Sequence, residues 1–318
     1  MPEATAGPVV AFIGLGNMGT PMVTRLVAAG YEVRGFDVSP DAVARLQNIG
    51  ATACGTASEA ANAASIVILM LPNSAIVASV VAEMTDSHSV AEGDVIVDMS
   101  SSEPVATQAL AQSLQASGVA LVDAPVSGGV KGAEKGSLTI MVGGGESEIA
   151  RVLPVISELG RPVRCGAVGS GHAIKALNNS LSATHLLATS EALEAGVAFG
   201  LDPAVMLSVF NSSSGRSGST ENKWPNFVLP GTYDSGFGLA LMLKDMKIAL
   251  GLSESTNAPH DLSSRAVELW SAAAAELPAK ADHTEIARWV AGAPVDGSRD
   301  TTAAPRPWKG VEVGGETQ

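Results

Sequence analysis

The feature that most constrains the fold is a glycine-rich turn that directly follows a short apolar run. The run covers residues 9–13, and residues 14–19 fit the pattern G-x-G-x-x-G. An amphipathic stretch, Pro21–Ala29, comes next, so the pattern predicts a strand, a tight turn and a helix. Such a turn brings the backbone close to a dinucleotide pyrophosphate at the helix N-terminus, although a purely structural glycine turn is the alternative. The predicted cofactor-binding residues of this turn are Gly14, Leu15, Gly16, Asn17, Met18 and Gly19.

An acidic residue follows the glycine turn at the spacing that dinucleotide-binding folds use. Asp37 lies 23 positions beyond Gly14, at the end of the second predicted strand. A carboxylate there accepts hydrogen bonds from the adenosine ribose hydroxyls and repels a 2′-phosphate. No arginine follows it directly, so the sequence predicts NAD as the cofactor in preference to NADP. The alternative is that Asp37 caps a helix that starts near Pro40.

The first half of the chain alternates apolar runs with helical patterns. The further predicted strands cover residues 32–36, 66–71, 95–97, 121–122, 138–142 and 163–165. Helical stretches such as Asp41–Ile49 and Pro104–Ala116 lie between them. This alternation predicts an α/β domain of the Rossmann type, a doubly wound parallel sheet with helices on both faces.

The second half reads as helical. From His172 to Phe199 there is no proline and Ala, Leu and Glu dominate, which predicts a long interdomain helix. Further helices are predicted over 203–210, 239–255, 261–275 and 284–290, and residues 212–222 are predicted to be a polar loop. We therefore expect three parts: a dinucleotide-binding domain over residues 1–168, an all-α substrate and oligomerisation domain over 169–293, and a flexible tail over 294–318.

The composition excludes several classes of protein. The 318 residues carry 19 Lys and Arg against 32 Asp and Glu, a net charge of −13, which argues against unaided binding to nucleic acid or anionic lipid. No apolar run reaches the roughly 18 residues that a membrane helix needs, and no secretory signal is visible. The two cysteines and five histidines show no metal-ligand spacing. We expect a cytoplasmic protein that uses no metal, nucleic acid or membrane.

Four motifs in order then carry a family resemblance. They are FIGLGNMGTPM (Phe12–Met22), DAPVSGG (Asp123–Gly129), GSGHAIKALNN (Gly169–Asn179) and LMLKDMKIAL (Leu241–Leu250). With these motifs the chain resembles the β-hydroxyacid dehydrogenase family, which includes 3-hydroxyisobutyrate dehydrogenases, over nearly its whole length. The resemblance implies reversible hydride transfer between NAD and a small β-hydroxyacid of the 3-hydroxyisobutyrate type. It also implies a homodimer or a homotetramer.

The resemblance assigns roles to individual residues. Lys175 matches the catalytic lysine, and Asn179 matches a residue that holds the substrate beside it. The substrate carboxylate is implied to bind at Ser127, Gly128 and Gly129. Further cofactor contacts are implied at Leu71, Pro72, Ser101 and Lys244. One position departs from the family pattern, because Ile76 stands where many relatives carry an asparagine that contacts the cofactor.

These residue types suit the implied chemistry. A neutral lysine can accept the hydroxyl proton, and burial near the nicotinamide ring and Lys244 would lower the pKa of Lys175. Asn179 lies four positions after Lys175, on the same helix face. The structural alternatives are a solvated helix lysine and a capping asparagine. At the level of function, the alternatives are a reductase of imines or aldehydes and a non-catalytic cofactor-binding module. Imine reductases of this fold usually carry Asp or Tyr in place of the lysine and use NADP.

Overall fold

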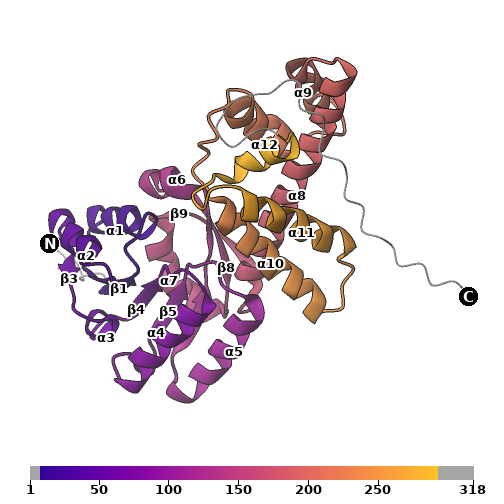
Figure 1. Ribbon diagram of the computed structural model, residues 1–318. Helices are drawn as coiled ribbons and strands as arrows, with labels where there is room; N and C mark the ends of the chain where they lie inside the picture. Colours follow the sequence, from indigo (N-terminus) through magenta and orange to yellow (C-terminus); the bar gives the residue numbers. More distant parts are fainter. Residues whose placement is uncertain (1–7, 293–318) are drawn as a thin grey trace, which may run out of the picture. The chain divides into compact units, whose positions relative to one another are not determined.

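The computed structural model describes residues 8–292, and Figure 1 shows it as a ribbon. Two compact units can be separated within this range. One contains residues 8–180 and 244–263, and the other contains residues 181–243 and 264–292. The domain division predicted at residue 168 follows the end of the last strand, whereas these units divide inside a long helix, α8 (Ser170–Phe199). The predicted tail, 294–318, lies outside the described residues.

Within residues 8–292, nine strands form one sheet in the first unit, in the order β3-β2-β1-β4-β5-β6-β8-β7, with β9 pairing with β8. The strands are β1 (Val10–Ile13), β2 (Val33–Phe36), β3 (Thr52–Ala53), β4 (Ile66–Leu69), β5 (Val95–Asp98), β6 (Ala120–Asp123), β7 (Val126–Ser127), β8 (Leu138–Gly143) and β9 (Gly160–Gly166). The neighbouring strands from β3 to β6 pair in parallel, whereas β8 pairs antiparallel with β6 and β7. The predicted parallel sheet is confirmed.

Helices cover both faces of this sheet because the central strands are apolar on both sides. They are α1 (Gly19–Ala28), α2 (Pro40–Ile49), α3 (Ala57–Ala61), α4 (Ser74–Asp86), α5 (Pro104–Leu114), the 3₁₀ turn η1 (Gln115–Ser117), α6 (Gly129–Lys135) and α7 (Glu146–Ser157). On one face α1, α2, α6 and α7 pack against residues such as Phe12 and Val97. On the other face α3, α4 and α5 pack against residues such as Ile13 and Ile96 (Figure 1).

The order of the strands sets where a ligand can bind. From β1 the chain runs outward through β2 to β3, and it then crosses to β4 on the other side of β1. In an open parallel sheet a ligand binds at the carboxyl ends of the strands beside such a reversal. The glycine turn follows β1 at this point. The fold therefore places residues 14–19 where a dinucleotide is expected.

Past β9 the described chain is helical. Its elements are α8, α9 (Pro203–Asn211), the π-helix η2 (Ser219–Val228), α10 (Leu239–Ser255), α11 (Asp261–Glu276), the 3₁₀ turn η3 (His283–Glu285) and α12 (Ile286–Val290). The prediction of a loop over 212–222 is wrong for its last residues, because η2 begins at Ser219. Within residues 8–292, no helix combines the length and the apolarity that crossing a membrane requires.

Candidate active site

The three glycines of the turn after β1 are required for different reasons. Gly14 has a positive φ of 100°, and a side chain on it would overlap the carbonyl oxygen of Met70. A side chain on Gly19 would overlap the carbonyl oxygen of Gly14. A Cβ on Gly16 would meet no atom within 4 Å. Packing within the chain therefore explains Gly14 and Gly19, whereas Gly16 borders open space that a ligand could fill.

Two further features of this turn fit a pyrophosphate-binding role. No side chain of the described residues caps the N-terminus of α1, so the N–H of Gly19 can face an anion, whereas the Thr20 N–H donates to the Gly16 carbonyl oxygen and Pro21 has no N–H. Asp37 lies directly after β2 and accepts hydrogen bonds from the backbone N–H groups of Leu15 (2.7 Å) and Ser39 (2.8 Å). The carboxylate thus lies against the glycine turn, while the N-cap residue of α2 is Ser39. The residues present fit a dinucleotide.

Lys175 and Asn179 form a buried polar cluster with two residues of α10. Only 8% of Lys175, 6% of Asn179 and 2% of Asp245 is exposed. The Asn179 amide donates a hydrogen bond of 2.6 Å to the Asp245 carboxylate. Lys244 Nζ lies 3.7 Å from the other carboxylate oxygen of Asp245. Since Lys175 and Asn179 lie one turn apart on α8, this cluster brings the predicted catalytic and substrate-binding residues together.

The electrostatics of the cluster favour a lysine that can lose its proton. Burial lowers the pKa of Lys175, the Asp245 carboxylate opposes this shift, and the Lys244 ammonium adds to it. Burial likewise raises the pKa of Asp245, against the effect of the two lysines. When all three groups are ionised, two positive charges face one negative charge. The cluster therefore has a net positive charge, which suits an anionic ligand, while Lys175 is protonated, and no net charge once Lys175 is neutral.

Lys244 also joins the cluster to the loops that follow β4 and β5. Its ammonium donates to the carbonyl oxygens of Pro72 (3.1 Å) and Ser101 (3.0 Å). Beside Lys244 and Ser101, a cavity of about 570 Å³ opens between α10 and the starts of α4 and α5. The predicted cofactor residues Pro72, Ser101 and Lys244 thus meet at one place, next to a space that can hold a ligand group.

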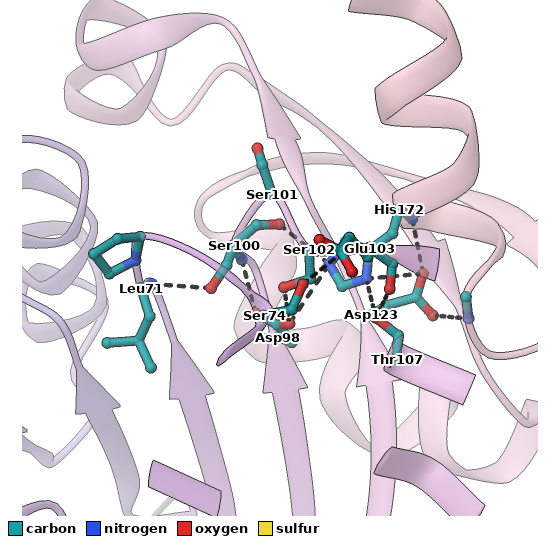
Figure 2. A network of polar contacts seen from close by, with 12 residues as sticks. Leu71, Ser74, Asp98, Ser100, Ser101, Ser102, Glu103, Thr107, Asp123 and His172 are labelled. Carbon is teal, nitrogen blue, oxygen red and sulfur yellow. Dashed lines mark hydrogen bonds and ion pairs between the residues drawn. The ribbon is translucent and has the colours of Figure 1, made fainter. Parts of the chain in front are cut away.

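A buried polar network lies beneath these loops (Figure 2). The Ser100 hydroxyl accepts a hydrogen bond of 2.9 Å from the N–H of Leu71. Asp98, at the end of β5, accepts one from the Ser100 N–H (2.9 Å) and one from the Ser102 hydroxyl (2.7 Å). Asp123, at the end of β6, accepts hydrogen bonds from the N–H groups of Gly169 (2.7 Å) and His172 (2.9 Å).

Most residues of this network were not predicted from the sequence. Asp123 and Asp245 belong to the motifs that carry the resemblance, and Asp98 follows a predicted strand directly, so a signal was present for each. His172 is a different case, because its position in the first turn of the predicted helix gives no sign of its contacts. It is only 1% exposed and has hydrogen-bond partners on both ring nitrogens.

The predicted carboxylate-binding residues form a turn of their own. Ser127 ends β7, Gly128 and Gly129 have positive φ values of 132° and 62°, and α6 begins at Gly129. Within residues 8–292, no hydrogen bond joins these three residues to Lys175 or Asn179. The same range contains no group of three or more His, Cys, Asp or Glu side chains arranged to hold a metal ion. The metal-free expectation stays a prediction.

Comparison with known proteins adds sequence and structural relatives. Residues 9–169 match the family described as the NAD binding domain of 6-phosphogluconate dehydrogenase. Residues 169–290 match the family described as NAD-binding of NADP-dependent 3-hydroxyisobutyrate dehydrogenase. The 2-(hydroxymethyl)glutarate dehydrogenase of Eubacterium barkeri is 39% identical over 82% of this chain and 87% of that protein. The mitochondrial 3-hydroxyisobutyrate dehydrogenase of Homo sapiens is 37% identical over 88% of this chain and 86% of that protein.

Among the solved structures similar to this chain is the 3-hydroxyisobutyrate dehydrogenase of Mycobacterium tuberculosis with L-serine. Its TM-score is 0.85, and its sequence is 31% identical. The alignment covers 89% of this chain and 99% of that one. The likeness therefore extends over both halves of the chain.

Proposed function

Since the chain belongs to the β-hydroxyacid dehydrogenase family, we propose that it is an NAD-dependent oxidoreductase for a small β-hydroxyacid, with Lys175 as general acid and base. The observation that carries this proposal is the cluster of Lys175, Asn179, Lys244 and Asp245, in which every residue except Lys244 is buried. It supplies a lysine with a lowered pKa and places the Lys244 ammonium beside the predicted cofactor residues.

The names of the relatives suggest a substrate class. 3-Hydroxyisobutyrate, 2-(hydroxymethyl)glutarate and L-serine are all 3-hydroxypropanoates that differ in the substituent on C2. That substituent is a methyl, a carboxyethyl or an amino group. We propose that this protein oxidises the C3 hydroxyl of such an acid. The carboxylate and the hydroxyl are then the constant groups, and C2 carries the group that distinguishes one substrate from another.

Each predicted residue has a defined part in this reaction. When bound, the nicotinamide cofactor supplies the hydride acceptor. Neutral Lys175 takes the hydroxyl proton onto Nζ and, in the reverse direction, returns it to the carbonyl oxygen. The turn of Ser127, Gly128 and Gly129 offers a hydroxyl and backbone N–H groups to the carboxylate. One N–H of the Asn179 amide is held by Asp245, and the other is left to donate to the substrate.

The preference for NAD is part of the proposal and rests on Asp37. Its carboxylate is already held against the glycine turn by the Leu15 N–H. A ribose diol could replace that hydrogen bond, whereas a 2′-phosphate would place like charges together. The remaining proposed contacts to the cofactor come from Leu71, Pro72, Ser101 and Lys244.

The proposal is tested by following NAD reduction at 340 nm, at about pH 9, with a panel of 3-hydroxypropanoates that vary at C2. The same panel is run with NADP. We expect turnover of at least one acid, with kcat/KM for NAD well above that for NADP. Comparable rates with both cofactors would contradict the proposal that Asp37 selects NAD over NADP.

Failure of the whole panel would separate the alternatives. If the protein binds NADH but oxidises no hydroxyacid, reduction of imines and aldehydes is assayed with NADH and NADPH. Turnover there would move the protein to the reductase class. Cofactor binding without turnover on either panel would favour the remaining alternative, a non-catalytic cofactor-binding module.

Two expectations about the protein in its cell and in solution stay proposals. A homodimer or homotetramer would show in light scattering as a multiple of the 32.1 kDa chain mass. A cytoplasmic location would show on cell fractionation.

A further inference from the structure

His172 makes three hydrogen bonds that tie the first turn of α8 to the end of β6, to α5 and to the segment after β5. Its backbone N–H donates to the Asp123 carboxylate at 2.9 Å. On the ring, Nδ1 lies 2.8 Å from the hydroxyl of Thr107 in α5, and Nε2 lies 3.1 Å from the carbonyl oxygen of Ser100. A carbonyl oxygen can only accept, so Nε2 carries a hydrogen and donates to Ser100.

The bond to Ser100 completes a short path between the proposed catalytic and cofactor-binding residues. Ser100 accepts the Leu71 N–H through its hydroxyl, and the next residue, Ser101, binds Lys244 through its carbonyl oxygen. On the other side, His172 lies three residues before Lys175 on the same helix. Figure 2 shows the ring of His172 between the end of β5 and the start of α8.

Burial makes this path stiff. His172, Ser100, Asp98 and Asp123 are each at most 2% exposed, so water cannot replace a lost hydrogen bond. The ring also lies near both carboxylates, with Nε2 3.7 Å from Asp98 and Nδ1 3.9 Å from Asp123. These contacts hold the ring in one orientation, and the Asp123 carboxylate itself faces the N-terminal end of α8, where the helix dipole favours an anion.

We infer that His172 is a positioning residue, which sets the place of Lys175 relative to the Ser100–Ser101 segment through its hydrogen bond to Ser100. The inference rests on the proposed function, because the distance between Lys175 and the cofactor-binding Ser101 affects catalysis only if Lys175 transfers the substrate proton. A displacement of about 1 Å between reacting groups can reduce turnover by about 100-fold. Loss of the Ser100 bond is therefore expected to act on kcat more than on KM.

Two substitutions distinguish the hydrogen bond of one ring nitrogen from that of the other. In His172→Gln the side-chain amide can reach the position of Nε2 and donate to Ser100. In His172→Asn the shorter amide reaches only the position of Nδ1, so it keeps the bond to Thr107 and loses the bond to Ser100. Thr107→Val is the matched control, because it removes the partner of Nδ1 and leaves the Ser100 bond in place.

The positioning role predicts that His172→Asn lowers kcat about 10- to 100-fold with KM changed less than about 3-fold. His172→Gln and Thr107→Val should keep kcat within about 3-fold of the wild type, whatever they do to the melting temperature. Equal losses in the Gln and Asn variants, or losses of kcat that follow the melting temperature across all three, would overturn the inference.

Crystal structures of the two His172 variants supply a readout that needs no substrate. After superposition on the sheet, His172→Asn should shift the first turn of α8 relative to Ser100, and His172→Gln should not. Unshifted structures of both variants would refute the positioning role even if the wild type proved inactive on hydroxyacids. Inactivity of the wild type together with the expected shift would instead refute the proposed function alone.

Discussion

The reactivity proposed for Lys175 depends on residues that are distant from it in the sequence. The identity of this lysine and its spacing from Asn179 are visible in the sequence, and the family motif marks it. Its environment is not visible, because the Asp245 carboxylate that opposes the lowering of its pKa comes from a helix about 70 positions further along. The same holds for His172, whose partners Ser100 and Thr107 are distant in sequence. Long-range contacts of this kind follow from the fold.

The lowered pKa of Lys175 predicts the pH dependence of the reaction. Oxidation needs the neutral amine, so kcat/KM should rise about tenfold per pH unit and level off below 10.5, the ordinary pKa of lysine. Reduction needs the protonated amine, so its rate should fall over the same range. Initial rates in both directions from pH 6 to 10.5 provide the test. A reductive rate that does not fall with rising pH over this range would rule out Lys175 as the acid and base.

Gly16→Ala is predicted to leave the stability of the fold unchanged and to weaken cofactor binding. Gly16→Ala should change the free energy of unfolding by less than about 0.5 kcal/mol, since its Cβ meets no atom of the chain within 4 Å. It should weaken NADH binding about tenfold or more, because the methyl group fills the space left for the pyrophosphate. Urea unfolding and a fluorescence titration with NADH measure the two effects.

Gly19→Ala is the control for that pair. Its methyl group would overlap the Gly14 carbonyl oxygen, so the variant should lose about 2 kcal/mol or more of stability. If Gly16→Ala binds NADH as the wild type does, the turn does not hold the cofactor in the proposed way.

At the scale of elements, long periodic segments were predicted well and short or interrupted ones were not. The predicted helix from His172 to Phe199 matches α8 to within two residues at its start. The two-residue strands β3 and β7 are too short to carry a periodic pattern. β9 contains Gly160 and Pro162 and was predicted only over its last part. The polar composition of residues 219–222 predicts a loop, yet tertiary packing makes them helical.

The start of η3 combines a helix cap with a buried histidine. Asp282 caps this turn and accepts hydrogen bonds from the Thr284 N–H and hydroxyl. Burial lowers the pKa of His283 to about 4, with the Lys223 ammonium adding to the shift and Asp282 opposing it. The folded protein therefore holds His283 neutral at pH 7.

This shift predicts a loss of stability in mild acid. Unfolded His283 takes up a proton near its ordinary pKa of 6.5 and the folded form only near about 4. The unfolded state binds more protons between these values, so stability falls as the pH falls through that window, by about 3 kcal/mol at most. His283→Gln should flatten the dependence of unfolding free energy on pH between 4 and 6.5. The same substitution at the exposed His185 is the control. An unchanged pH dependence of the unfolding free energy in His283→Gln would contradict the prediction.

For the whole molecule, the fold class and the family were predictable because they depend on patterns spread along the chain. The alternation of strands and helices predicts the doubly wound sheet, and the glycine turn locates its ligand-binding edge. The assignment of residues to the two compact units was not predictable in the same way. Residues 244–263 group with the first unit, although the chain reaches them only after residues 181–243 of the second. This return brings Lys244 and Asp245 to the predicted catalytic lysine.

In the proposed reaction a buried lysine on α8, Lys175, performs the proton transfer of an NAD-dependent oxidation. The most direct measurement compares wild type with Lys175→Ala and Lys175→Arg on the acid that the substrate panel identifies. NADH binding is titrated in parallel. We expect both variants to bind NADH within about threefold of the wild type and to lose at least about 100-fold in kcat. Oxidation at a near-normal rate by either variant would contradict this role of Lys175.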